Sequence, residues 1–248
     1  MSISTLIDMP VAETISGKLV TVNWIDVSHQ LHETGYATIH RLLTPDECAA
    51  IRGLYDRPHG YRKTVVMERF RFGRGEYKYF DYPLPEVVQT IRSEVYPNLI
   101  PVANTWMQQL RIQKIFPQTH EQLINECHDQ GQRKPTPLIL KYGEGGFNTL
   151  HQDLYGEVYF PLQTVLLLSE PDTDFTGGEF VLTQQNPRAQ SKAIVLRPRM
   201  GDMIIFTTNF RPVASRSGFY RAAMRHGVSE VTSGERYTLG IIFHDAMN

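Results

Sequence analysis

Apolar residues recur at helical spacing through the first half of the chain. Residues 44–56, TPDECAAIRGLYD, begin as a capping box: Thr44 suits the N-cap, Pro45 the first helical position, and Glu47 follows three residues after the cap. The alternating stretch just before it, residues 35–43, predicts a strand that leads into this helix. The same spacing predicts further helices over residues 85–96, 103–113 and 119–131.

The pattern changes near residue 135. Short β-rich runs now follow one another, with turn residues such as Gly177-Gly178 and Ser233-Gly234 between them. Many short strands without intervening helices predict a mostly β sandwich or barrel, of which the double-sheet jelly roll is one form. The predicted strands lie within residues 136–143, 162–169, 178–184, 193–198, 201–208, 226–231 and 236–244.

This change of pattern also predicts how the chain is organised. Residues 1–136 are expected to form a helical and strand extension, or lid, that covers the mouth of the active site. Residues 137–248 are expected to form the jelly-roll core. At 248 residues the chain is short for several separate domains, so we expect the two parts to pack as one structural unit.

Composition narrows the class of protein. The chain is 41% hydrophobic and 21% charged, as expected for an ordinary soluble protein, and its net charge of −1 gives no global preference for polyanions. Cys48 and Cys127 cannot form a disulfide framework, and Cys48 is expected to be a buried small hydrophobe. The first residues, MSISTLIDMPVAETISG, lack the features of a secretory signal, and no apolar run is long enough for a membrane span. We therefore expect a cytoplasmic protein with no membrane or protein partner.

A candidate metal site begins in the stretch NTLHQDLYG, where His151 and Asp153 stand two residues apart. On a strand they would project from the same face. His226 is the best candidate for a third ligand, because RHGVSEVTSGERYTLGIIF indicates a strand, a Ser-Gly turn and a returning strand. This hairpin would place Arg236 beside the histidine strand and Thr238 on the same face as Arg236.

Two histidines and one carboxylate on one side of an octahedral ion are typical of non-haem Fe(II) oxygenases. The guanidinium of Arg236 and the hydroxyl of Thr238 would form a clamp for a carboxylate, since guanidinium binds carboxylate with two parallel hydrogen bonds. A 2-oxo acid could then chelate the iron at one end and meet Arg236 at the other. A chance pair on a solvated strand, a zinc site and a non-catalytic metal-binding barrel are the alternatives to this interpretation.

His151-x-Asp153, His226 and Arg236 ten residues later resemble the motif of the Fe(II)/2-oxoglutarate-dependent dioxygenase superfamily. The segments FTGGEFVL and RPRMGDMIIF are similar to strands of its prolyl-hydroxylase-like branch, and the resemblance covers roughly residues 137–245. It implies a double-stranded β-helix core, Fe(II), 2-oxoglutarate as co-substrate, and dioxygen (O2). It also implies that Tyr142 and Thr238 bind 2-oxoglutarate, and that hydroxylation is coupled to formation of succinate and carbon dioxide.

The whole chain, including RFGRGEYKYFDYPLP, is similar to a bacterial family described as oxygenases of damaged, alkylated DNA. This resemblance implies demethylation of alkylated bases. The alkylated-DNA-repair enzymes usually carry a second arginine soon after the co-substrate arginine, and YTLGIIFHDAMN after Arg236 has none. A protein side chain or a small metabolite therefore stays open as the substrate of the same chemistry.

Charge and aromatic rings are concentrated in residues 52–80, and a second basic stretch covers residues 188–225. Cations that meet phosphates and rings that stack on an extruded base are what a base-modifying enzyme needs. The alternative is a half-exposed strand with its aromatic residues inward and its charges outward. The candidate substrate-binding residues are Arg69, Arg71, Arg74 and Tyr77.

The remaining histidines are expected to play no part in the site. His120 and His128 stand eight apart on a predicted helix, which is poor ligand geometry, and we expect both at the surface. His244 and Asp245 are adjacent on a predicted strand and would point in opposite directions, so we expect a structural role for them.

Overall fold

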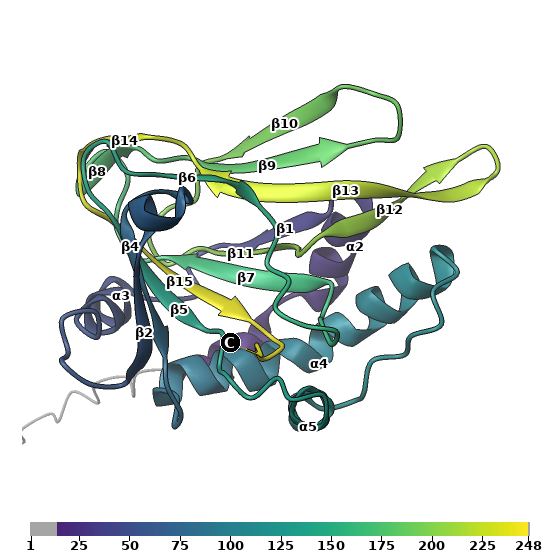
Figure 1. Ribbon diagram of the computed structural model, residues 1–248, viewed down its shortest axis with the longest axis horizontal. Coiled ribbons are helices and arrows are strands. Elements are labelled where there is room, and N and C mark those ends of the chain that lie inside the picture. The colour runs from purple at the N-terminus through teal and green to yellow at the C-terminus, as the bar shows by residue number, and fades with distance from the viewer. Residues whose placement is uncertain (1–13, 248) are drawn as a thin grey trace, which may run out of the picture.

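The computed structural model describes residues 14–247, in which two antiparallel sheets lie one above the other (Figure 1). The larger sheet contains, in spatial order, β1 (Tyr36–Ile39), β11 (Met203–Thr207), β7 (Leu162–Leu167), β15 (Arg236–Ile242), β5 (Leu138–Tyr142), β4 (Glu76–Phe80) and β2 (Tyr61–Val66). The smaller sheet contains β10 (Ser191–Leu196), β9 (Phe180–Gln185), β13 (Gly218–Val228), β6 (Phe147–His151) and β3 (Gly73–Arg74), with β12 (Phe210–Ser215) paired to β13. A short ribbon joins β8 (Phe175–Gly177) to β14 (Val231–Gly234). The predicted jelly-roll architecture is confirmed.

Helices cover the outer side of the larger sheet (Figure 1). They are α1 (Ile15–Thr21), α2 (Trp24–Thr34), α4 (Glu86–Gln109) and α5 (His120–Asp129), while α3 (Pro45–Arg52) and the 3-10 helix η1 (Met67–Phe70) lie near β2 and β4. The main apolar core forms between these helices and the larger sheet. Because the central strands of this sheet are covered on both faces, β11 and β15 are buried at every position, which suits the apolar run of residues 203–206 in β11.

Strands from before residue 137 lie at both edges of the larger sheet, β1 on one side and β4 with β2 on the other. The N-terminal part of the chain therefore completes the sheet that carries the core strands. The division of the chain at residue 136 stays a prediction.

The predicted capping box forms, since Thr44 and Glu47 exchange both hydrogen bonds at the start of α3. A second capping box, of Thr119 and Gln122, begins α5 and was not predicted. Cys48 is fully buried, as expected, and burial raises the pKa of its thiol to about 11.

The two helices predicted over residues 85–96 and 103–113 are instead one helix, α4, which runs through Pro97 and Pro101. A proline inside a helix removes a backbone donor and usually kinks or ends it. Here both prolines stand four residues apart on the exposed face, where water can reach the carbonyl groups that lose their partners. The buried face of α4, with Leu99 and Trp106, continues without a break.

The predicted hairpin between the His226 strand and the Arg236 strand is wrong. β13 pairs with β6, β9 and β12, whereas β15 pairs with β5 and β7 in the opposite sheet. The intervening segment forms β14, which pairs with β8. The Ser-Gly turn is present, since Gly234 has a φ of 76°, but it leads the chain from one sheet to the other.

His120 is buried, with 5% of its surface exposed, so its predicted surface position is wrong. It begins α5, where its Nε2 donates to the carbonyl of Phe243 at 2.8 Å. Burial, followed by the nearby Arg92 charge, lowers the pKa of His120 to about 3, so the ring is neutral. His128, which is half-buried, lies 3.1 Å from Asp245.

His244 and Asp245 are both fully buried. Asp245 forms an ion pair of 2.7 Å with Arg92 of α4 and accepts a hydrogen bond from the Tyr82 hydroxyl at 3.0 Å, which ties the C-terminal segment to α4. The His244 ring accepts from the backbone nitrogen of Phe160 at 3.2 Å, and its centroid lies 6.1 Å from that of Tyr155.

None of the helices within residues 14–247 has the length and hydropathy needed to span a bilayer. Most of the N-terminal stretch in which the sequence predicts no secretory signal, residues 1–13, lies outside the described part of the chain.

Candidate active site

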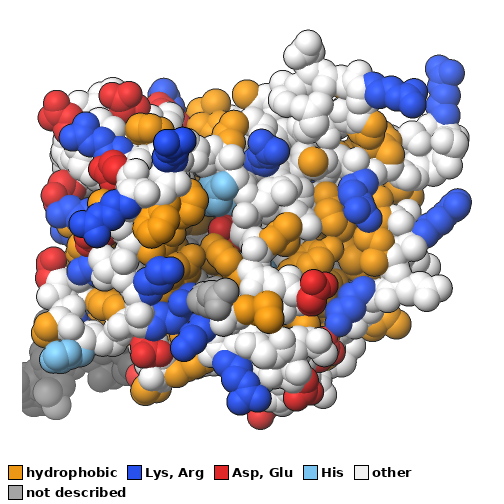
Figure 2. All heavy atoms as spheres, in the orientation of Figure 1, with side chains coloured by type: hydrophobic (Ala, Val, Ile, Leu, Met, Phe, Trp, Pro, Cys, Tyr) orange, Lys and Arg blue, Asp and Glu red, His pale blue; other side chains and the backbone are white. Residues whose placement is uncertain are grey.

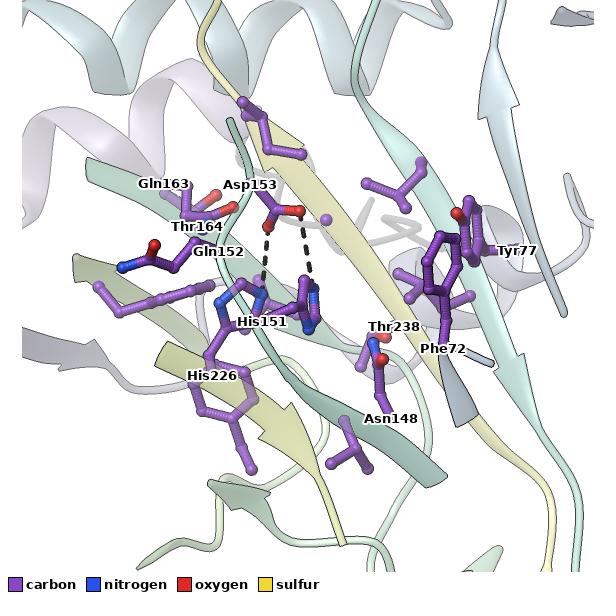
Figure 3. A pocket seen from close by; sticks show the side chains of 18 of the residues that line it. Phe72, Tyr77, Asn148, His151, Gln152, Asp153, Gln163, Thr164, His226 and Thr238 are labelled. Atoms are coloured by element: carbon purple, nitrogen blue, oxygen red, sulfur yellow. Dashed lines mark ion pairs between the residues drawn. The ribbon is translucent and has the colours of Figure 1, made fainter. Parts of the chain in front are cut away.

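A cavity of about 230 Å³ lies between the two sheets. It receives side chains from the smaller sheet on one side and from the larger sheet on the other (Figure 3). In Figure 2 the cavity is visible as a hollow with a histidine and an acidic side chain at its bottom, hydrophobic side chains beside it and blue basic ones around it. The residues used below that line it are Phe72, Tyr77, Tyr79, Tyr142, Asn148, Thr149, His151, Asp153, Tyr155, Gln163, Thr164, His226, Arg236 and Thr238.

His151, Asp153 and His226 converge at one point of this cavity. His151 ends β6 and stands directly opposite His226 of β13 in the antiparallel pairing, which brings the two rings to 4.2 Å between centroids. Asp153 follows just after the end of β6, and its Oδ2 lies 3.1 Å from Nε2 of His226. Its Oδ1 lies 3.6 Å from Nε2 of His151, and one ligand atom from each residue falls within 4.8 Å of the others. Figure 3 shows both histidines facing the carboxylate.

Hydrogen bonds and burial orient these groups toward a common centre. His151 donates from Nδ1 to the carbonyl of Thr149 at 2.8 Å, which leaves Nε2 free to bind a metal. Burial, and then the neighbouring His151, lower the pKa of His226, so its ring is neutral. Burial alone would raise the pKa of Asp153, but His226, His151 and the Tyr155 hydroxyl hold it well below its usual range. The neutral imidazole of His226 and the ionised carboxylate of Asp153 are in the protonation states that metal binding requires.

Tyr155 supports the carboxylate and was not among the residues singled out from the sequence. Its hydroxyl donates to Oδ1 of Asp153 at 2.6 Å and accepts a hydrogen bond from the Tyr79 hydroxyl at 3.1 Å. Burial, followed by the charge of Asp153, raises the pKa of Tyr155 well above its ordinary value, so the phenol stays a donor. One oxygen of Asp153 is thereby occupied, and the other faces His226.

Arg236 lies at another part of the cavity, at the start of β15 and opposite Tyr142 of β5. Only 2% of its surface is exposed, and neither Nε nor Nη1 has a hydrogen-bond partner. Its guanidinium lies 5.7 Å from the ring centre of Tyr142 and 5.8 Å from that of Phe175. Burial lowers the pKa of Arg236 to about 10, so the group is charged at neutral pH. Within residues 14–247 it forms no ion pair, and Glu179 is the acidic side chain whose charge acts on it.

Thr238 and Tyr142 line the same cavity as Arg236. Thr238 stands two residues after Arg236 on β15, so both side chains leave the same face of the strand. Asn148 donates to the Tyr142 hydroxyl at 3.3 Å, and burial raises the pKa of Tyr142 to about 12. Gly178 leaves room for the Arg236 side chain, since a Cβ there would lie 2.9 Å from the Arg236 Cδ.

Unpartnered polar atoms are concentrated in this cavity. Within residues 14–247, six buried side-chain nitrogen or oxygen atoms have no hydrogen-bond partner, and five of them belong to residues that line it. Buried polar groups are normally paired, and each exception calls for an explanation. A polar ligand would supply the missing partners. The five atoms are Gln163 Nε2, Thr164 Oγ1, His226 Nδ1, Arg236 Nε and Arg236 Nη1.

The candidate substrate-binding residues lie around the mouth of the cavity. Tyr77 lines the cavity, whereas Arg69, Arg71 and Arg74 are exposed beside it. The alternative interpretation, with aromatic residues inward, holds for Tyr79 and Phe80 of β4, which are buried. It is wrong for Phe70 and Phe72, which are 51% and 45% exposed.

One part of the second basic stretch also differs from expectation. Arg211 is buried, and its guanidinium bonds to the side-chain oxygen of Gln184 and to the carbonyl of His32. It ties β12 to β9 and α2, and is not available to a substrate. Arg221 and Arg225 of β13 are exposed.

The fold defines a class of proteins. It resembles a prolyl 4-hydroxylase from Phytophthora capsici, with 17% identity, a TM-score of 0.55, and coverage of 97% of this chain and 68% of that one. It also resembles an oxidoreductase of the 2OG-Fe(II) oxygenase family from Burkholderia pseudomallei, with 16% identity, a TM-score of 0.52, and coverage of 92% and 94%. At these identities the likeness concerns the fold, which is that of the jelly-roll oxygenases.

Sequence comparison gives the family. Residues 75–246 match the family described as an oxygenase that catalyses oxidative methylation of damaged DNA. Two Mycobacterium tuberculosis proteins, both described as uncharacterised, are 46% identical over 167 residues, which cover 67% of this chain and 72% of each of theirs. The chain belongs to this oxygenase family, and it is an enzyme of the oxidoreductase class.

Proposed function

We propose that this protein is an Fe(II)- and 2-oxoglutarate-dependent dioxygenase that hydroxylates a methyl group on an alkylated base of DNA. The observation that carries the proposal is the content of one cavity: three convergent metal-ligand groups and a buried guanidinium with two free donors. Membership of the oxygenase family supports the reaction type.

The three ligand groups fit a ferrous ion. His151, Asp153 and His226 provide two imidazoles and one carboxylate, the set associated with non-haem iron and open positions on the remaining side. Iron and 2-oxoglutarate bound here would supply the oxidising chemistry. In that reaction dioxygen would convert 2-oxoglutarate to succinate and carbon dioxide and would hydroxylate a C–H bond of the substrate. The chain itself holds the ligands in place, through the Thr149 carbonyl on His151 and the Tyr155 hydroxyl on Asp153.

Arg236 fits the far carboxylate of 2-oxoglutarate. Two parallel N–H groups can bind a carboxylate with two hydrogen bonds, and the low-dielectric surroundings strengthen that contact. In our proposal Thr238 and Tyr142 add hydroxyl groups beside it. The co-substrate would then extend from Arg236 toward the three ligand groups, so that its oxidisable end lies by the metal.

DNA is proposed as the substrate because of the family and the mouth of the cavity. The family description names damaged DNA, and exposed arginines with exposed rings surround the opening. A hydroxymethyl group formed on a base nitrogen loses formaldehyde and leaves the demethylated base. Arg69, Arg71, Arg74 and Tyr77 are the proposed substrate-binding residues.

Succinate formation tests the proposal. The protein with Fe(II) and 2-oxoglutarate is supplied with methylated oligonucleotides, the same oligonucleotides without the methyl group, and peptides containing proline. We expect succinate release to be stimulated by the methylated oligonucleotides, with one formaldehyde per succinate. Stimulation by the peptides alone would replace DNA by a protein substrate. No succinate with any compound, and no visible absorption band with anaerobic Fe(II) and 2-oxoglutarate, would favour a metal-binding barrel without catalysis.

A further inference from the structure

The mouth of the cavity has a rim of two unusual components. One is a pair of exposed phenyl rings, Phe70 and Phe72, stacked with 5.5 Å between centroids and 19° between planes. The other is a set of exposed arginines without ion pairs among the residues that the structure describes. They are Arg69, Arg71 and Arg74, which flank the cavity-lining Phe72 in the chain.

The ring pair is held by a tightly built segment. η1 ends at Arg71, which adopts the left-handed conformation with φ of 59°, and the backbone nitrogen of Phe72 then donates to the carbonyl of Met67. Gly73 pairs with Asn148 of β6 so closely that a Cβ would lie 2.2 Å from the Phe147 carbonyl oxygen. The segment is therefore fixed to the smaller sheet, and it presents Phe72 at the cavity wall, across from the three ligand groups (Figure 3).

The segment that carries the ring pair is basic. Residues 67–75 contain three exposed arginines and one acidic residue, Glu68, which accepts a hydrogen bond from the nitrogen of Gly75. Because the whole chain has a net charge of −1, this rim is a local basic surface on a neutral protein. In Figure 2 blue side chains stand on both sides of the hollow.

We propose that this rim binds a single strand of DNA across the mouth, with Arg69, Arg71 and Arg74 on its phosphates and the Phe70–Phe72 pair stacked against the base beside the target. The inference rests on the proposed function and assigns the residues that hold the polymer. Exposed aromatic rings next to cations are how proteins hold single strands without reading their sequence. Bases inside a duplex are already stacked on each other, so a ring platform favours a strand whose bases are accessible.

The test measures binding to a fluorescein-labelled single strand of about 15 nucleotides with one N-methylated adenine, a length within the range of known single-strand sites. Oxygen is excluded, so that no turnover occurs. Three phosphate contacts predict that log K falls with log salt with a slope of about −2.1, and Arg69→Ala/Arg74→Ala should reduce this slope by about 1.4. Phe70→Ala and Phe72→Ala should each weaken binding about 5- to 150-fold.

Matched controls lie elsewhere on the surface. Phe219 is 45% exposed, as Phe72 is, so Phe219→Ala removes an equally exposed ring away from the mouth. Arg111→Ala/Arg133→Ala removes two exposed charges away from β13 and η1. Both controls should bind the strand as the unmodified protein does.

Equal affinity and equal salt slope in the Arg69 and Arg74 variant would overturn the inference, and so would tighter binding to a duplex of the same sequence. Succinate formation is recorded in parallel to separate the two proposals. Strand binding that depends on the rim, without succinate formation, would contradict the proposed reaction and support the rim. Succinate formation with DNA, together with DNA binding that is unchanged in the rim variants, would support the proposed reaction and contradict the rim.

Discussion

Replacing Arg236 by methionine should weaken 2-oxoglutarate binding and at the same time stabilise the ligand-free protein. The guanidinium is buried and forms no ion pair within residues 14–247, and two of its nitrogens have no partner. It therefore carries a desolvation penalty in the empty site that only an anion relieves. Methionine has a similar length and no charge, so it fills much of the same space without that penalty.

The magnitudes follow from the site. Two hydrogen bonds to a charged group contribute about 1.5–3 kcal/mol each, so their loss should raise the dissociation constant of 2-oxoglutarate about 10²- to 10⁴-fold. Burial lowers the pKa of Arg236 from 12.5 to about 10, which corresponds to a penalty of about 3 kcal/mol in the free energy of unfolding at neutral pH. The guanidinium lies 5.7 and 5.8 Å from the ring centres of Tyr142 and Phe175, at the outer limit of cation–π contact, so each contact contributes only about 0.5–1 kcal/mol and would be lost. A net gain of about 1–2 kcal/mol remains, or ~2–8 °C in Tm.

Two measurements check this prediction. Titration calorimetry with Mn(II) in place of Fe(II) gives the affinities for metal and for 2-oxoglutarate, and calorimetric melting gives Tm of the ligand-free protein. Metal affinity should be unchanged, because Arg236 is not among the three ligand groups. Arg133→Met serves as the control, since it removes an exposed arginine and should change neither quantity. Unchanged co-substrate affinity in Arg236→Met would refute the anchor role, and a lower Tm would refute the idea of an uncompensated charge.

Three further predictions follow from the same structure. Tyr155→Phe removes the donor to Asp153 and should lower Mn(II) affinity about 10- to 100-fold with little change in Tm; equal affinity would show that the hydroxyl does not position the carboxylate. Arg92→Met leaves Asp245 buried without its ion-pair partner and should lower the free energy of unfolding in urea by about 3–5 kcal/mol. Arg92→Met/Asp245→Asn should recover part of that loss. No recovery would mean that the loss does not come from the unpaired charge of Asp245. The pKa of His120 is about 3 in the folded protein and near 6.5 in the unfolded chain. Between these values the unfolded chain binds a proton at His120 and the folded protein does not, so stability is lost as pH falls below about 6.5. His120→Gln keeps a donor for the Phe243 carbonyl and should remove about 2 kcal/mol of the loss measured between pH 7.5 and pH 5, whereas an unchanged loss would mean that His120 is protonated in the folded state.

Local patterns in the sequence were sufficient for much of the fold. The cap at Thr44 and the buried strands β7, β11 and β15 depend on neighbouring residues, so spacing and residue type predict them. Strand pairing depends on contacts far apart in the chain. The alternation around Arg236 indicates which face its side chain shares with Thr238, but it contains nothing about which strand lies alongside, and the hairpin prediction failed for that reason.

The site shows the same division. His151, Asp153 and His226 were brought together as the sequence predicted, whereas Tyr155 and Gln163 carry no signal of their own in the sequence. A tyrosine two residues after an aspartate is common, and only the turn after β6 places its hydroxyl on the carboxylate. His120 was misplaced because its spacing on the helix says nothing of the Phe243 carbonyl that meets it.

His226 and Arg236 are ten residues apart in the chain but belong to opposite layers of the sandwich. A small molecule that contacts the metal centre and the guanidinium at once would therefore cross-link the two layers. Its binding energy would resist their separation, so metal and co-substrate together should raise the melting temperature by more than the sum of their separate effects. The protein without metal and co-substrate would then be the less stable form. The co-substrate would both take part in the reaction and hold the two sheets together.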